Sequence, residues 1–169
     1  MLRLLAIAAL LALSGCGLKP MYAGGSNAAL AQGLAAVEVA PIPGRDGWLV
    51  RNALVDRFSV AGAAAPQYRL DVRLDDSLEG LGVLNDDTIS RERRILRSRY
   101  QLVDLTSGEI LLDATAGSDA GVDVVSSEYA TIAAEQTALE LLAKDVAERM
   151  VRRVALTLRQ REAGQAAGQ

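Results

Sequence analysis

Residues 67–75 alternate between apolar and polar side chains, and this pattern constrains the fold more than any other part of the chain. The run reads QYRLDVRLD. Because successive side chains of a strand point to opposite faces, the run predicts a strand with one buried face and one face in water. A covering layer is therefore expected on one side of the sheet only. The side chains expected to face that layer are Tyr68, Leu70, Val72 and Leu74.

Two further runs predict an antiparallel hairpin. Residues 88–104 are apolar on one parity and strongly basic on the other, which predicts a long strand with one wet face. Thr106-Ser107-Gly108 predicts a tight turn, and residues 109–116 (EILLDATA) predict the returning strand. The side chains expected to point inward are Leu96, Tyr100 and Leu102 in the first strand and Ile110, Leu112, Ala114 and Ala116 in the second.

The segments between these runs predict one short strand and two connections. Residues 34–40 (LAAVEVA) predict a strand that is closed by a turn at Pro41-Ile42-Pro43-Gly44. Residues 77–87 combine two glycines with Asn-Asp-Asp, which predicts a loop. Residues 117–125 are interpreted as a link to the last element.

A first amphipathic pattern predicts a helix of about four turns after Asp46, which is a good N-cap. Residues 61–66, which include Gly62, are expected to end it. Trp48 and Phe58 are expected in the core, because the chain has few aromatic residues to fill one. The predicted buried stripe is Val50, Leu54 and Phe58, with Leu49 and Ala53 beside it.

A second, longer pattern predicts a helix from Glu128 to about Arg161. Ser126 or Ser127 can cap its start, and Gly164 is expected to end it. Its predicted apolar stripe is Ala134, Ala138, Leu141, Val146 and Val154.

The order of elements is therefore β-α-β-β-β-α. The simplest architecture that buries both helical stripes is an α+β two-layer sandwich, with two helices packed on a four-stranded mixed sheet. We expect a single domain over residues 34–162 and a disordered tail over residues 163–169.

The N-terminus has the pattern of a bacterial lipoprotein signal. One positive charge at Arg3 precedes an apolar run over residues 4–13, which is too short to span a membrane. Leu13-Ser14-Gly15-Cys16 matches the lipobox, in which the Cys thiol takes the lipid. We therefore expect a signal peptide at residues 1–15, a diacylglycerol and an N-acyl chain on Cys16, and a flexible tether at residues 16–33. An ordinary signal peptide followed by an unmodified Cys is the alternative interpretation.

Composition excludes several classes of function. The chain has no His and one Cys, which removes His-based catalytic triads and the usual zinc sites. The formal net charge of −3 becomes −4 once Arg3 leaves, so a basic nucleic-acid binder is excluded. No carboxylate pair suggests a general acid and base, and no enzyme or cofactor is expected. Residues 85–87 (Asn-Asp-Asp) could hold calcium, but they lack the spacing of a calcium loop, which favours a plain turn.

Five short motifs resemble the LptE family of lipopolysaccharide-assembly lipoproteins, in particular its alphaproteobacterial branch. They are CGLKPMY at residues 16–22, LVRNAL at 49–54, YRLDV at 68–72, YQL at 100–102 and SEYA at 127–130. The resemblance implies a non-enzymatic outer-membrane protein that binds and plugs the large β-barrel that inserts lipopolysaccharide, helps the barrel to assemble and contacts lipopolysaccharide. It also implies two helices on a four-stranded sheet. Gly17 after the modified Cys resembles lipoproteins sent to the outer membrane.

The candidate contact residues are four arginines, Arg91, Arg93, Arg97 and Arg99, which share one face of the predicted strand over about 27 Å. Three interpretations stay open. The arginines could bind phosphates of the lipid A headgroup, because guanidinium groups bind phosphate in a bidentate manner. They could contact the barrel wall. They could also form a solvated face, paired with Asp71, Asp75 and Asp113 on neighbouring strands.

An alternative function is another periplasm-facing lipoprotein module, transport-auxiliary or envelope-binding, without a barrel partner. The expected location is in either case a membrane surface reached through the lipid on Cys16.

Overall fold

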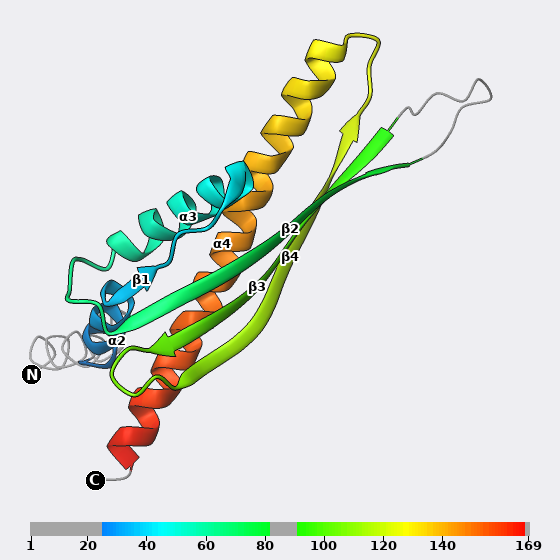
Figure 1. Cartoon of the computed structure of the whole chain (residues 1–169). Coiled ribbons are helices and arrows are strands. Elements are labelled where there is room, and N and C mark those ends of the chain that lie inside the picture. The colour runs from blue at the N-terminus through cyan, green and yellow to red at the C-terminus, as the bar shows by residue number, and fades with distance from the viewer. Residues whose placement is uncertain (1–24, 82–90, 168–169) are drawn as a thin grey trace, which may run out of the picture.

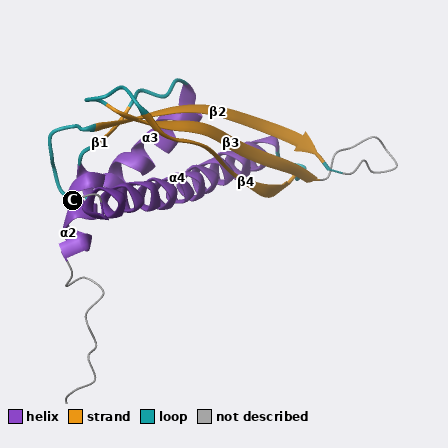
Figure 2. Ribbon diagram, turned by 90° about the horizontal axis from the view of Figure 1, so that it is seen from below, coloured by secondary structure: helices purple, strands orange, loops and turns teal. Residues whose placement is uncertain are grey.

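A computed structural model of the chain describes residues 25–81 and 91–167. Its elements are α2 (Gly25–Ala35), β1 (Val37–Val39), α3 (Gly44–Ser59), β2 (Tyr68–Gly80), β3 (Arg91–Asp104), β4 (Ile110–Asp123) and α4 (Glu128–Ala167). The sheet order is β1-β2-β3-β4, with β1 parallel to β2 and the other pairs antiparallel. The helices lie on one side of this sheet (Figures 1 and 2). The predicted α+β two-layer sandwich with a four-stranded mixed sheet is confirmed.

The core lies between α3, α4 and the inner face of the sheet. The α3 stripe is confirmed, since Val50, Leu54 and Phe58 are all buried. The inner side chains of β2 and β3 also agree with the alternation in the sequence. The largest fully buried side chains of the sheet are Leu70, Leu96, Tyr100 and Leu102, and those of α4 are Val146, Met150, Val154 and Leu158.

Helix α2 occupies residues 25–33 of the stretch that was predicted to be a flexible tether, and it also includes residues 34 and 35, which were predicted to begin a strand. Its sequence, GSNAALAQGLA, carries little amphipathic signal. Leu30 and Leu34, which are one helical turn apart, pack against the core, and Gly33 approaches Leu158 of α4. A short helix of this kind is stabilised mainly by such tertiary packing, which a local pattern does not reveal.

The start of α3 and the position of Trp48 were predicted wrongly. The helix begins at Gly44, after Pro43, and Asp46 lies in its first turn instead of at its N-cap. Trp48 is 62% exposed and does not belong to the core. The reason is Gly47, whose backbone lies so close to the carbonyl of Ile42 that a Cβ there would be 2.6 Å from the oxygen. This contact turns Gly47 inward and the adjacent Trp48 outward.

β2 and β4 are longer than predicted, whereas β1 covers only Val37–Val39 of the strand predicted at residues 34–40. β2 continues to Gly80 through the start of the predicted loop, and β4 continues to Asp123 through the predicted link at residues 117–125. Each pairs with β3 along this extra length. Ile110 is 52% exposed, contrary to the prediction, because a register shift at Leu102/Val103 changes the pairing at the start of β4.

The buried stripe of α4 recurs every four residues and includes Ala138, Leu142 and Val146. The residue that follows each of these three is also buried. Leu141 and Ala134, which were predicted to be inward, are exposed. The helix also continues past Gly164 to Ala167. Gly164 does not adopt positive φ, so it acts as a tolerated helical residue and not as a C-cap.

The β3–β4 turn is confirmed at residues 106–108, with Gly108 at φ 74°. The Asp104 carboxylate accepts hydrogen bonds from the backbone N–H of Thr106 at 2.8 Å and of Ser107 at 3.2 Å. It also pairs with Arg161 of α4 at 2.8 Å. The N–H groups of Thr106 and Ser107 are the main cause that holds the pKa of Asp104 below its ordinary value. Asp104 therefore connects the turn to the C-terminal part of α4.

We predict that Asp104→Asn lowers the melting temperature by several degrees at pH 7, because it removes a carboxylate that is stabilised in the folded state. A carboxylate whose pKa is lower in the folded than in the unfolded state stabilises the fold at pH values above its unfolded pKa of about 3.9. This contribution is lost as the pH falls through the folded pKa. The difference between variant and wild type in circular-dichroism melts should therefore shrink as the pH falls below about 3.9. A difference of equal size at pH 7 and pH 2.5 would contradict this account; Glu140→Gln on the exposed side of α4 is the control.

Candidate functional site

The sheet face opposite the helices, called the open face below, is covered by none of the described elements (Figure 2). Residues that are paired across neighbouring strands point to the same face of the sheet, so the strand registers show which side chains lie on the open face. β3 contributes the four candidate arginines, β2 contributes alternating basic and acidic residues, and β4 contributes acidic ones. Its basic members are Arg69, Arg73, Arg91, Arg93, Arg97 and Arg99, and its acidic members are Asp71, Asp75, Glu79, Asp113, Asp119 and Asp123.

Three of the four candidate arginines form ion pairs with β4. The Nε of Arg93 lies 3.0 Å from a carboxylate oxygen of Asp119, and the Nη2 of Arg99 lies 3.0 Å from one of Asp113. Arg91 and Asp123 are 3.5 Å apart. All of these side chains are substantially exposed, so each pair contributes little to stability. The pairs hold the guanidinium groups in a regular row above the sheet.

The charge of Asp113 is held in place by two neighbours. Arg99 donates to its two carboxylate oxygens, and the Gln101 amide donates at 2.8 Å. These hydrogen bonds, chiefly that from Arg99, keep the pKa of Asp113 below its ordinary value, and the same bond raises the pKa of Arg99. The pair therefore stays fully ionised near neutral pH.

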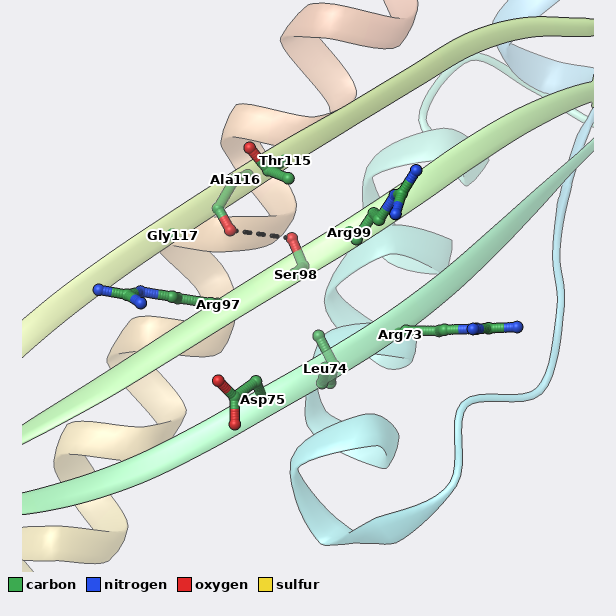
Figure 3. A pocket seen from close by; sticks show the side chains of 9 residues that line it. All are labelled: Arg73, Leu74, Asp75, Arg97, Ser98, Arg99, Thr115, Ala116 and Gly117. Atoms are coloured by element: carbon green, nitrogen blue, oxygen red, sulfur yellow. Dashed lines mark hydrogen bonds between the residues drawn. The ribbon is translucent and has the colours of Figure 1, made fainter.

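Arg97 differs from the other three candidates. Within residues 25–81 and 91–167, no carboxylate lies within 4.0 Å of its guanidinium. Its stem crosses Gly117 of β4, where an added Cβ would be 3.4 Å from Arg97 Cγ. Figure 3 shows the side chain extending across the sheet from β3. A glycine at position 117 thus leaves space for an arginine whose head is available to a ligand.

A hollow of about 480 Å³ lies beside Arg97 on the open face (Figure 3). Arg73, Arg99 and Asp75 also line it. A second hollow of about 590 Å³ shares Arg73 and Arg99 and reaches Pro41, and a third of about 220 Å³ shares Arg97. The three adjoin one another along β3 and form an elongated, charged depression.

Arg94 lies on the opposite, helix-facing side of β3, and the sequence did not predict its role. Only 17% of its side chain is exposed, and it forms a two-point contact with Asp76 of β2 at 2.5 and 3.0 Å. It also donates to the Glu135 carbonyl of α4 at 3.0 Å. The hydrogen bond with Asp76 is the main cause that raises the pKa of Arg94. Arg94 is therefore structural, because it joins β2, β3 and α4 where the apolar core ends.

Of the three predicted carboxylate partners, Asp113 pairs with the arginine row, whereas Asp71 pairs with Arg69 of its own strand. Asp75 lies opposite Arg97 in the register without a contact within 4.0 Å. The sequence missed Asp119 and Asp123 because residues 117–125 were interpreted as a link. The signal was present, since polar or glycine residues recur at every second position from Asp113 to Asp123.

The arrangement suits binding and not acid–base chemistry. Its guanidinium groups can donate hydrogen bonds to phosphate or carboxylate ligands, or to acceptor groups of a protein surface. In the described part of the chain, no group of three or more His, Cys, Asp or Glu is placed to hold a metal ion. The same residues include no helix that is both long and apolar enough to span a membrane. Cys16 and the predicted turn at residues 85–87 lie outside the described residues.

The fold is similar to that of several solved lipoprotein structures. A candidate lipoprotein from Caulobacter crescentus CB15 matches with a TM-score of 0.64 and 23% identity, covering 76% of this chain and 95% of that one. A minor lipoprotein from Acinetobacter baumannii matches with a TM-score of 0.56 and 13% identity, covering 72% and 92%. Lipoprotein B from Nitrosomonas europaea matches with a TM-score of 0.52 and 14% identity, and the match covers 70% of this chain and 81% of that one. At such identities the likeness concerns the fold alone.

The fold and the open face define a small two-layer α+β binding module. The family model LptE, described as lipopolysaccharide-assembly, matches residues 34–154, so this chain belongs to the LptE family. No curated protein matches the sequence. Membership of the family assigns the chain a role in lipopolysaccharide assembly.

We predict that Arg94→Ala and Arg97→Ala have very different effects on stability. Losing Arg94 leaves the largely buried Asp76 without its partner and should cost about 2 kcal/mol. Arg97→Ala should change stability by less than about 0.5 kcal/mol, because its head has no carboxylate partner in the described chain. Urea unfolding of the two variants measures both values. Equal losses would show that the assignment of structural and ligand-facing arginines is wrong.

Proposed function

We propose that this chain is a non-catalytic, lipid-anchored protein that binds the outer-membrane β-barrel which inserts lipopolysaccharide, and that it helps this barrel to assemble. Family membership supports the process, and the open face supports the mode of action. The barrel partner and the location at the outer membrane are parts of the proposal.

The observation that carries this proposal is the charge balance of the open face. Equal numbers of basic and acidic side chains cover three long strands, and no described element covers them. The interior of a transmembrane barrel is polar, so a protein that fills it needs a polar surface of matching extent. A face with near-zero net charge and many hydrogen-bonding groups meets that need without repelling either sign of charge on the wall.

The proposed lipid on Cys16 would keep this domain close to the membrane. Nine peptide bonds join Cys16 to Gly25, and a fully extended chain of that length reaches only about 30 Å. Such an attachment raises the effective concentration of the domain near a membrane-embedded partner without any further contact.

Lipopolysaccharide is the second proposed ligand of the open face. Arg73 and Arg97 flank the central hollow, and neither lies within 4.0 Å of a carboxylate in the described chain. Two guanidinium groups of this kind can hold a phosphate of the lipid A headgroup. The remaining arginines of the open face are already paired, Arg69 with Asp71 of β2 and the other three with aspartates of β4, so the hollow is the part of the face whose guanidinium groups are available to a ligand.

A photo-crosslinking side chain at position 97 tests the proposal in cells. We expect the label to appear on a protein of much greater mass that co-purifies with the lipidated chain in mild detergent. The matched control is a crosslinker at Arg159, which is exposed on α4. Crosslinks to glycolipid from position 97 would establish lipopolysaccharide contact separately.

Arg97→Glu should reduce recovery of the large partner several-fold, whereas Arg159→Glu should not. The barrel hypothesis fails if no large membrane protein co-purifies in several detergents. It also fails if positions 97 and 159 give the same crosslinked products, since the open face would then have no special role.

A further inference from the structure

No described strand pairs with the outer edge of β4. β4 is the last strand of the sheet and pairs with β3 alone among the described elements, over fourteen residues from Ile110 to Asp123. Its second row of backbone N–H and C=O groups therefore has no strand beside it among the described elements. A long edge of this kind is a template for pairing with another extended chain.

This edge lacks most of the features that block such pairing. β4 contains no Pro and no Lys, and the one register shift lies near its start. Its central side chains are small, at Ala114, Ala116 and Gly117, so another backbone can approach closely. The outer edge of β2 differs, because β1 covers its first residues and the chain then continues through Pro41 and Pro43.

The acidic side chains of β4 do not leave the edge negatively charged. Asp113, Asp119 and Asp123 are each paired with an arginine of β3. Arg97 reaches over Gly117 in addition, without a carboxylate within 4.0 Å in the described chain. On the open face, the centre of β4 therefore presents a positive charge.

The helix-facing side of the same edge carries two arginines of α4 and one carboxylate, Asp145, which accepts a hydrogen bond from Ser118 of β4 at 3.2 Å, so its balance is also positive. A hollow of about 390 Å³ lies between the centre of β4 and α4, and Arg149, Arg153 and Tyr100 line it. The two arginines are one helical turn apart and exposed, and the described chain places no carboxylate within 4.0 Å of either. Burial raises the pKa of Tyr100, and the nearby Arg153 opposes that change, which agrees with a guanidinium close to the phenol.

We propose that an acidic, extended segment of a partner protein adds to β4 as a fifth strand of the sheet. Its main chain pairs with the free edge, and its carboxylates contact Arg149 and Arg153 on the helix side and Arg97 on the open side. Main-chain pairing supplies affinity in this mode of recognition, and the side chains supply specificity. Arg97 also lines the depression along β3. The backbone edge of β4 and the pair Arg149 and Arg153 take no part in the proposed barrel contact, so tests on them can fail independently of that contact.

A second copy of the chain fits this edge poorly. Antiparallel pairing of two β4 edges about their centres would bring the Arg149 and Arg153 pairs of both copies to one place. Such like charges repel one another, whereas an acidic strand neutralises them.

Binding of a labelled peptide to the full chain in mild detergent tests the proposal. The probe is a capped ten-residue peptide of repeating Glu-Glu-Thr-Thr, which places carboxylates on both faces of an added strand, and a Lys-Lys-Thr-Thr peptide of the same length is its control. Fluorescence anisotropy should show saturable binding of the acidic peptide and binding at least about tenfold weaker for the basic one. Hydrogen exchange should show new protection within residues 110–123, which a purely electrostatic contact would not produce.

Arg149→Glu with Arg153→Glu should weaken binding of the acidic peptide about tenfold. The matched control, Arg152→Glu with Arg159→Glu, makes the same change of charge on exposed positions of the same helix and should alter binding less than about twofold. The proposal is wrong if the acidic peptide does not bind, if it binds without protecting β4, or if both double variants weaken binding equally. Dimerisation of the free chain through β4 would also overturn it.

Discussion

The packing of α4 against the inner face of β3 and β4 is the interaction on which the rest of the structure depends. Val146, Met150 and Val154 are fully buried, as are Leu96 and Leu102 on the sheet. Apolar residues recur at about every fourth position along α4 and at every second position along β3, so each element presents one continuous apolar stripe to the other. This contact covers one face of the sheet and leaves the other to the charged residues.

The charged open face follows from that one-sided cover. Exposed arginines on β3 would repel one another, but the aspartates of β4 compensate for them: Asp123 lies directly opposite Arg91, and Asp119 and Asp113 pair diagonally with the other two. Gly117 and Gly121 are part of the same arrangement, because a Cβ at either position would lie within 3.4 Å of an arginine side chain of β3. The cost is a strand made of small residues with an unpaired outer edge. Stability of the face and availability of the β4 edge thus have a common origin.

The sequence predicted the parts of the fold in which a local pattern and the tertiary contact agree. The stripe of α3 and the alternation of β2 and β3 are examples, since their periods match their secondary structure. The sequence-based prediction was wrong where a contact between residues outside one local pattern determines the structure. The extension of β4 through Gly117 and Gly121 needs the arginines of β3, helix α2 needs α4, and the outward position of Trp48 needs the contact between Gly47 and Ile42.

By itself, the sequence determined the α+β class, the basic parity of β3 and the motifs that resemble the LptE family, because these depend on residue spacing within single segments. It also established that the four candidate arginines share a face, since strand geometry alone requires it. Only the tertiary structure decided which arginines have charge to offer. Arg91, Arg93 and Arg99 find aspartates on β4 and Arg94 finds Asp76, whereas Arg97 lies over a glycine, and these differences depend on the register between strands.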